Sequence, residues 1–329
     1  LTRAIDLLLN HRDDLVAALV DDFGARSPDM SMLTDIAAAV APLRNARANL
    51  ETWMRPQARK ITPAALGLLG AKAHVRYQPK GVVGVMTPWN FPVQLSFDAI
   101  AGAFAAGNRV MLKPSEYSPA TSALMGQLID LYFDEDELAV VQGGPEVGAA
   151  FAGLPFDHLI FTGATSIGRH VMRAAADNLT PVTLELGGKS PVIVGKSADI
   201  AKSAARIMGG KAMNAGQVCL APDYVLAPAG SVDAFVSAAT AAGAKMFPTI
   251  RDNPDYTAII NQRHYERVRG LVDDARAKGA RIVEINPANE DFTQQEHRKI
   301  PLTLVLDATD EMGVMQEEIF GPVLPVRSY

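Results

Sequence analysis

The chain of 329 residues has a single cysteine, Cys219, so it lacks the second one that an intramolecular disulfide or a cysteine zinc site would need. It also lacks a run of basic residues, and 31 Lys+Arg against 36 Asp+Glu leave a formal net charge of -5. With this balance the sequence predicts no positively charged patch that would attract nucleic acid or anionic lipid. These absences predict a protein of the reducing cytoplasm that acts on small molecules and binds no nucleic acid.

Long hydrophobic runs are absent as well. The longest stretch without a charged residue, Gly81 to Phe97, contains Pro88 and Pro92, whereas a membrane-spanning helix needs about 20 apolar residues in succession. The sequence therefore predicts no membrane span. Because the chain starts inside a predicted helix and stops shortly after a Gly-Pro turn, we expect it to be cut at both ends.

What the sequence does contain is a rhythm of short β-branched runs separated by helix-length segments. It follows two amphipathic helices, expected at residues 5–23 and 32–53. Nearly apolar strands that alternate with helices imply a parallel sheet covered on both faces. The fold class predicted is α/β, with a doubly wound parallel sheet. The expected strands are residues 82–86, 109–112, 138–141, 158–161 and 182–184.

A second α/β series begins at Ser190, so we expect two domains, residues 1–188 and residues 189–329. Ligands of doubly wound sheets bind beyond the carboxyl ends of the strands. The loops at residues 87–92, 113–116 and 162–168 are therefore expected to converge on one crevice. In the second domain we expect strands at residues 191–194 and 224–226 and near Ile282 and Leu302, and helices at residues 198–213, 232–246 and 265–278.

The first candidate binding site is the turn Thr162–Gly168, which joins an expected strand to a helix. Free backbone N–H groups and the helix dipole attract phosphate at such a turn. The Walker pattern and the G-x-G-x-x-G spacing of the Rossmann fingerprint are both absent. A tight turn that needs glycine for backbone reasons explains the residues equally well.

Three side chains are candidates for chemistry. Cys219 lies on an expected loop, where its thiolate would be a good nucleophile, although a lone cysteine is most often a small buried hydrophobe. Glu185, at the end of an apolar strand, is either a base that takes a proton from water or the partner of Lys189 in an ion pair. Asn90, between two prolines, is either a turn residue or an amide donor to a developing oxyanion.

Six motifs follow one another along most of the chain: Pro88-Trp89-Asn90-Phe91-Pro92, Lys113-Pro114-Ser115-Glu116, Phe161-Thr162-Gly163, Glu185-Leu186-Gly187-Gly188-Lys189, Gly216-Gln217-Val218-Cys219 and Glu318-Ile319-Phe320-Gly321-Pro322. In this order and approximate spacing they resemble the aldehyde dehydrogenase superfamily. One such motif is weak evidence, whereas six in register are specific. The flanking residues 179–184 and 219–224 look most like the branch that contains coniferyl aldehyde dehydrogenase.

The resemblance implies a variant five-stranded Rossmann-like domain and NAD(P)-dependent oxidation of an aromatic or hydrophobic aldehyde to the acid. In that reaction Cys219 attacks the aldehyde carbon, and the Asn90 amide and the Cys219 backbone N–H hold the oxyanion of the thiohemiacetal. Glu185 then activates the water that hydrolyses the thioester. Transfer to coenzyme A is disfavoured, because a water-activating carboxylate would destroy the thioester.

For the cofactor, the resemblance implies that Lys113 and Glu116 contact the adenosine ribose and that Glu318 and Phe320 position the nicotinamide ribose and ring. We expect NAD, with NADP possible, because the Glu116 carboxylate should repel a 2′-phosphate. No metal is expected, and family analogy suggests a homodimer. Further cofactor contacts are expected at Trp89, Gly163, Ala164, Ile167 and Gly168, with the glycine turn under the pyrophosphate.

Two alternatives stay open at this point. A cysteine hydrolase would pair Cys219 with His158 or His170, the histidines expected nearest the crevice. A catalytically silent or truncated family member would only bind nucleotide. Dependence on NAD separates an oxidoreductase from the hydrolase, which ignores the cofactor.

Overall fold

The computed structural model describes residues 1–329, which divide into two compact units. The first unit comprises Leu1–Leu15 and Met32–Glu185, and the second comprises Val16–Ser31 and Leu186–Tyr329. The sequence assigned every residue before 189 to one domain, whereas Val16–Ser31 groups with the later residues. None of the helices is both long enough and apolar enough to cross a lipid bilayer.

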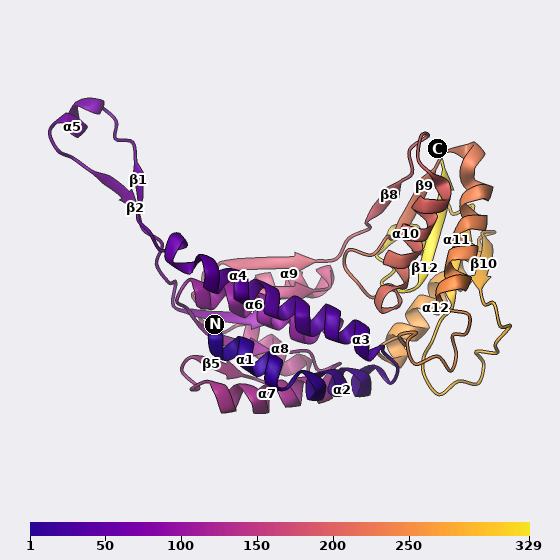
Figure 1. Ribbon diagram of the computed structural model, residues 1–329, viewed down its shortest axis with the longest axis horizontal. Coiled ribbons are helices and arrows are strands. Elements are labelled where there is room, and N and C mark those ends of the chain that lie inside the picture. The colour runs from indigo at the N-terminus through magenta and orange to yellow at the C-terminus, as the bar shows by residue number, and fades with distance from the viewer. The chain divides into compact units, whose positions relative to one another are not determined.

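The first unit is built on a five-stranded sheet with helices between the strands (Figure 1). Along the chain its elements are β3 (Val82–Met86), α6 (Pro92–Ala105), β4 (Arg109–Lys113), α7 (Pro119–Tyr132), β5 (Leu138–Val140), α8 (Pro145–Ala152), β6 (His158–Gly163), α9 (Thr165–Ala176) and β7 (Val182–Leu186). The strand order is β5-β4-β3-β6-β7, and β3 pairs in parallel with both β4 and β6. The predicted doubly wound α/β fold and its five strands are confirmed.

Proline and glycine mark the ends of these helices. Helices α6, α7 and α8 each begin with a proline at the first helical position, where the missing N–H is not needed and the fixed φ suits the helix. Gly107, with a φ of +79°, follows α6 and turns the chain into β4. These residues fix where α6, α7 and α8 begin and where α6 ends.

The order of the strands creates one ligand-binding edge. From β3 the chain proceeds outward to β4 and β5, then crosses back to β6, so the direction of winding reverses between β3 and β6. The register aligns Met86 of β3 with Lys113 of β4 and with Phe161 of β6. The loops that follow these three strands therefore share one edge, at a switch point of the kind that binds ligands, as predicted.

Strand β7 differs from the expected apolar strand buried on both faces. Thr183 and Glu185 are exposed, whereas Val182 and Leu184 are half-buried. The reason is its place at the edge of the sheet, where only one face is covered. The prediction of a fully buried strand was wrong here, and the Glu185 carboxylate is an exposed group.

The segment before the sheet is more divided than the sequence indicated. The elements are α1 (Thr2–Asn10), α2 (Arg12–Phe23), α3 (Pro28–Ser31), a π-helical turn η1 (Met32–Ala37) and α4 (Ala38–Trp53). His11 interrupts the first expected helix, and a change of helix type divides the second. In the first unit, α4 packs against α1 and α6.

An antiparallel arm follows α4 and extends away from the sheet of the first unit (Figure 1). It consists of β1 (Gln57–Arg59), α5 (Ala64–Leu68) and β2 (Ala73–Val75). No residue of these three elements is buried. Leu68 and Leu69 are 90 % and 83 % exposed, so the tip of the arm presents apolar side chains to solvent.

The second unit holds another five-stranded sheet, in the order β10-β11-β12-β9-β8. Its elements are β8 (Pro191–Ile193), α10 (Ile200–Ala212), the short turn η2 (Met213–Gly216), β9 (Tyr224–Ala227), η3 (Ala229–Ser231), α11 (Val232–Met246), α12 (Gln262–Ala277), β10 (Arg281–Ile285), β11 (Leu302–Leu306), α13 (Gly313–Gln316) and β12 (Val323–Ser328). Leu302, Leu304 and Leu306 pack with α10 and α11, whereas Val305 packs with α12 on the opposite face. The sheet is therefore covered on both faces.

Strand β12, the centre of this sheet, was not predicted. Its Pro325 argues against a central strand, because proline cannot donate to a ladder of hydrogen bonds. Pro325 pairs with Val305 of β11, but pairing with β9 begins only at Val326. The proline therefore precedes the second ladder, and its missing N–H leaves that ladder intact.

A buried cation stands out in the core of the second unit. Lys211, in the last turn of α10, is fully buried, and its Nζ has no hydrogen-bond partner. Burial lowers the pKa of Lys211 to about 8; Asp223 and Glu318 oppose this shift, and Lys189 adds to it. The signal in the sequence is a lysine in register with Ala204, Ile207 and Met208, on the apolar stripe of its helix.

We expect Lys211→Met to stabilise the protein at pH 7 by a few kcal/mol. Below pH 8 the folded wild type holds a buried ammonium, and each unit of pKa depression corresponds to about 1.4 kcal/mol. Above pH 8 the unfolded chain keeps a proton that the folded chain has lost, up to the ordinary lysine pKa of 10.5. Wild-type stability therefore rises with pH in this range, and the advantage of the variant shrinks.

Chemical denaturation at several pH values between 7 and about 10 measures this difference. Lys202→Met, on an exposed face of the same helix, is the matched control and should show no such trend. An advantage of Lys211→Met that does not change with pH would contradict the expectation.

Candidate active site

The loop after β3 carries Asn90 in a buried and braced position. Asn90 is 3 % exposed and Trp89 is 9 % exposed. At the start of the loop the Thr87 N–H donates to the Lys113 carbonyl oxygen over 3.2 Å, and the Thr87 and Ser96 hydroxyls are 2.9 Å apart. The loop is thus tied to β4 and to α6.

The turn after β4 holds an ion pair at the same edge. Lys113 Nζ lies 2.8 Å from Glu116 Oε2, with the lysine side chain buried and the glutamate exposed. The Ser115 carbonyl oxygen accepts the hydroxyls of Ser118 and Ser122, which fixes the turn. A buried ammonium and an accessible carboxylate, held side by side, suit a ligand with hydroxyl groups.

The turn after β6 opens helix α9 toward solvent. Ala164 is the N-cap residue, and Gly168 N–H closes the first turn onto its carbonyl oxygen over 2.9 Å. Ala164 and Ile167 are exposed, whereas Gly168 is buried. An exposed N-terminus of a 12-residue helix beside Gly163 offers free N–H groups to an anion.

Glu185 lies at this edge as well. The Leu159 N–H donates to the Pro181 carbonyl oxygen at the start of β6 and β7, so the two strands run in the same direction. Glu185, one residue from the end of β7, therefore belongs to the edge that carries Asn90, Lys113 and Gly163. The structure brings together the candidates of the first unit, and Glu185 is exposed enough to meet a water molecule.

His158 occupies the opposite edge, which corrects the expectation that it lies nearest the crevice. It is the first residue of β6, and Gly163 lies five positions later, on the order of 16 Å along an extended strand. Its ring nitrogens lie 2.8 Å from the Thr183 hydroxyl and 3.1 Å from Lys80 Nζ. Burial, followed by the charge of Lys80, lowers the pKa of His158.

In the second unit, Cys219 is exposed on the turn that follows α10 and η2. The turn is anchored by the completely buried Gln217, whose Nε2 donates to the carbonyl oxygens of Asn214 and Ala258 over 2.9 and 3.1 Å. Gln217 Oε1 accepts the Ile260 N–H over 3.1 Å. One amide side chain thus ties the cysteine turn to a distant segment, while the thiol stays accessible.

Three successive left-handed residues shape the approach to Cys219. Asn214, Ala215 and Gly216 have φ values of 49°, 51° and 73°. A Cβ atom on Gly216 would lie 2.2 Å from the Gly321 carbonyl oxygen. Glycine is therefore required there for two reasons, its φ and the close approach of two backbones.

Glu318 and Phe320 lie on the segment that leads to Gly321. The Glu318 carboxyl accepts a hydrogen bond from the Gly188 backbone N–H. Its side chain also lies against Gly187, where a Cβ atom would be 1.8 Å from Oε2. Burial raises the pKa of Glu318; the Gly188 hydrogen bond lowers it, as do Arg267 and Lys211, whereas Asp223 raises it further. Glu318 Oε1 is buried without a hydrogen-bond partner. An acceptor in this state fits a hydroxyl donor such as the ribose of NAD.

The hydrogen bonds that hold the segment of Glu318 in place were not predicted from the sequence. Asp223 pairs with Lys189 through one oxygen and accepts the Ile319 N–H with the other, over 3.0 Å. Lys189 also donates to the carbonyl oxygens of Val314 and Glu317, over 2.8 and 2.9 Å. Lys189 therefore has Asp223 as its carboxylate partner. The signal available was an acidic residue directly before an apolar strand.

Comparison with known proteins gives matches over the full chain. A family model described as "Aldehyde dehydrogenase family" matches residues 1–329. A probable coniferyl aldehyde dehydrogenase of Caulobacter vibrioides is 65 % identical, over 100 % of this chain and 68 % of that protein. The coniferyl aldehyde dehydrogenase of a Pseudomonas species is 55 % identical, over 100 % and 67 %.

Among solved structures, a Mycobacterium tuberculosis aldehyde dehydrogenase complexed with NAD+ has a TM-score of 0.87 and 29 % identity, over 100 % of this chain and 67 % of that one. The chain thus spans about two thirds of the length of these three relatives. A family match from the first residue to the last, together with relatives above half identity, establishes that the chain belongs to the aldehyde dehydrogenase family.

Proposed function

We propose that the protein oxidises an aldehyde to the carboxylic acid with NAD(P), and that the aldehyde has an aromatic or hydrophobic body of the coniferyl type. The observation that carries the proposal is the exposed Cys219 on a turn anchored by a buried Gln217, in a chain of this family. The substrate class is supported by the names of the relatives at 65 % and 55 % identity.

In the proposed mechanism the Cys219 thiolate forms a bond to the aldehyde carbon, and the carbonyl oxygen becomes an oxyanion. The Asn90 amide and the Cys219 backbone N–H hold that oxyanion as donors. A donor contributes most when it is fixed before the charge develops, and the braced loop of Asn90 meets this requirement.

NAD, when bound, accepts the hydride that leaves the thiohemiacetal carbon. Glu318 offers its buried acceptor to a ribose hydroxyl, and Phe320 lies two residues away at a φ of 49°. Lys113 and Glu116, held together as an ion pair, would flank the adenosine ribose of the bound cofactor. Trp89 and the Gly163–Gly168 turn complete the cofactor contacts of the proposal, the latter through the exposed N-terminus of α9 at Ala164 and Ile167.

Glu185 removes a proton from the water that attacks the thioester carbon, and the Cys219 sulfur then departs as the leaving group. An exposed carboxylate at the sheet edge can exchange that proton with solvent. In this proposal residues 1–188 form the dinucleotide-binding domain, which also supplies Asn90 and Glu185, and residues 189–329 form the catalytic domain, which carries Cys219.

The proposal extends to a cytoplasmic homodimer that binds no nucleic acid. Leu66, Leu68 and Leu69 on the arm are exposed, and apolar side chains gathered on a surface are typical of a site of association. The net charge of -5 and the absence of a basic run support the exclusion of nucleic acid.

The function is tested by mixing the intact protein with cinnamyl-type, aliphatic and acidic aldehydes, with and without NAD or NADP. Reduced nicotinamide should accumulate together with the acid only when both cofactor and aldehyde are present. Acid formation without cofactor would favour a hydrolase, and cofactor binding without turnover would favour a silent member of the family.

We expect Cys219→Ser to lose acid formation by on the order of a thousandfold or more, because a serine hydroxyl is a far weaker nucleophile at neutral pH. NAD binding, measured by calorimetry, should persist. Since the chain has no other cysteine, retained turnover in this variant would dismiss the thiolate mechanism.

For Glu185→Gln we expect a first-turnover burst of reduced cofactor and then a stall, because an acyl enzyme accumulates without a base to activate water. The steady-state rate should fall by about 10²–10⁴. Glu135→Gln, an exposed carboxylate on another loop of the first unit, is the control and should turn over normally. Steady turnover without a burst would count against the role of Glu185.

For Glu116→Gln we expect the preference for NAD over NADP to fall on the order of tenfold, about 1.4 kcal/mol. The change removes a carboxylate that repels a 2′-phosphate and leaves the Lys113 ammonium without its partner at 2.8 Å. The ratio of kcat/KM for the two cofactors measures the effect. Glu146→Gln, exposed in the first turn of α8, should leave the ratio unchanged; an unchanged ratio in Glu116→Gln itself would remove the ribose assignment.

A further inference from the structure

We propose that Asp35 is a positioning residue of the reaction, which holds the first turn of α6 and thereby the loop that carries Asn90. The inference rests on the proposed function, in which Asn90 is the oxyanion donor. Asp35 lies in η1, more than fifty residues before that loop, and belongs to none of the motifs in the sequence.

The geometry is that of a helix cap supplied by a distant element. Asp35 is completely buried, and its Oδ1 accepts the backbone N–H groups of Val93 and Gln94 over 3.3 and 3.4 Å. These are the second and third positions of α6, whose N–H groups the side chain of an N-cap residue ordinarily satisfies. The N-cap residue here is Phe91, which has no side-chain oxygen, so the carboxylate of Asp35 takes that place.

Charge adds to this arrangement. A buried carboxylate is costly unless positive potential compensates it. The N-terminus of the 14-residue helix α6 supplies such potential through its dipole. The two hydrogen bonds are long, so we expect a neutral replacement of Asp35 to weaken them and to lose the attraction between a carboxylate and the helix end.

Asn90 lies between two fixed points. Upstream, Thr87 is bound to the Lys113 carbonyl oxygen and to the Ser96 hydroxyl. Downstream, Asp35 holds the turn that begins with Pro92, whose carbonyl oxygen also accepts the Ser96 hydroxyl over 2.6 Å. Release of the downstream end would let the Asn90 amide drift, and a small misplacement of a donor lowers a rate strongly.

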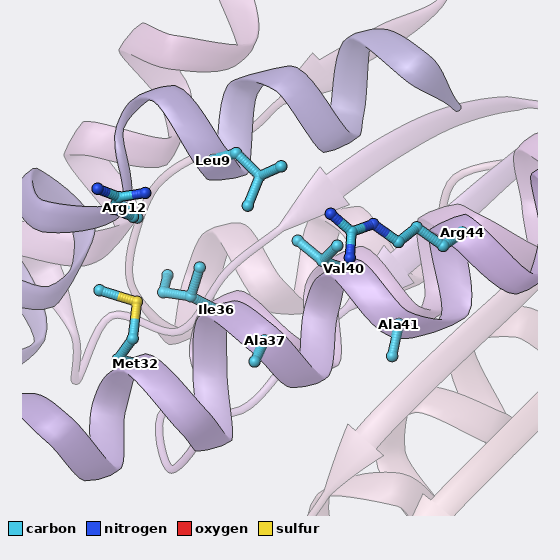
Figure 2. Close-up of a pocket in the computed structure, with 8 residues that line it drawn as sticks. All are labelled: Leu9, Arg12, Met32, Ile36, Ala37, Val40, Ala41 and Arg44. Carbon is cyan, nitrogen blue, oxygen red and sulfur yellow. The ribbon is translucent and has the colours of Figure 1, made fainter.

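The other face of η1 is open. Met32, Ile36 and Ala37 line a groove of about 540 Å³ together with Leu9 of α1 (Figure 2). Arg12 and Arg44 also line it, and Figure 2 shows Arg12 on the side of Met32 and the Arg44 guanidinium beside Val40. The same short segment thus has an open groove on one side and α6 on the other, which provides a control: a change at Ala37 alters η1 on its groove face without removing the carboxylate that caps α6.

The experiment is a double-mutant cycle between Asp35→Asn and Asn90→Ala in the intact protein, read as kcat/KM for the aldehyde. Asp35→Asn alone should lower kcat/KM about tenfold. In the Asn90→Ala background the same change should have no further effect, because Asp35 acts through Asn90. Ala37→Ser and Asp29→Asn, an exposed carboxylate of α3, should leave kcat/KM unchanged.

Thermal unfolding of Asp35→Asn shows whether Asp35 affects the rate or only the stability of the fold, since the loss of a buried charge need not lower stability. Wild-type kcat/KM in Asp35→Asn would overturn the inference while the proposed function stands. So would a double variant whose fall in kcat/KM equals the product of the falls in the two single variants. Wild-type protein without aldehyde oxidation would overturn both. If Asp35→Asn does not fold, Asp35→Ser, which removes the charge but keeps a short oxygen acceptor, gives the same cycle with the same criteria.

Discussion

The contact between the backbones at Gly216 and Gly321 is the constraint on which the site of the second unit depends. A Cβ atom at Gly216 would meet the Gly321 carbonyl oxygen at 2.2 Å, so the approach exists only because one side chain is absent. It joins the turn of Cys219 to the segment of Glu318, a hundred residues later in the chain. The Gln217 side chain then ties the cysteine turn to the backbone of Ala258, and the Asp223 carboxylate accepts the Ile319 N–H of the other segment. The turn that carries the exposed thiol is thereby held in place.

In the first unit the constraint is topological. Parallel strands can only be joined by crossovers, so every strand of the sheet ends at one edge, and the residue that follows each strand comes to that edge whatever its distance along the chain. This is why Asn90, Lys113, Gly163 and Glu185 share an edge although almost a hundred residues separate the first from the last. It also explains why His158, which begins a strand, lies on the wrong side for the proposed chemistry.

Much of this organisation could be predicted from the sequence, because apolar runs, prolines at helix starts and glycines at helix ends act locally. The strands of the first sheet and the edge they form followed from such signals. What could not be predicted depends on contacts between distant residues. Strand β12 contains Pro325 and becomes central only because its pairing with β9 starts one residue later. Glu185 is exposed because β7 is an edge strand, and Asp35 carries no local signal for the helix that it caps.

The buried charges show how a site of this kind trades stability for function. Burial favours the neutral form of Glu318, yet an acceptor for a ribose hydroxyl works best as a carboxylate. The Gly188 N–H, Arg267 and Lys211 each act against burial and favour the charged form. Lys211 can do so only by giving up its own solvation, as its depressed pKa shows. A core of apolar residues at these positions would be easier to fold, but it would remove the groups that act against the raised pKa of Glu318 and favour its charged form.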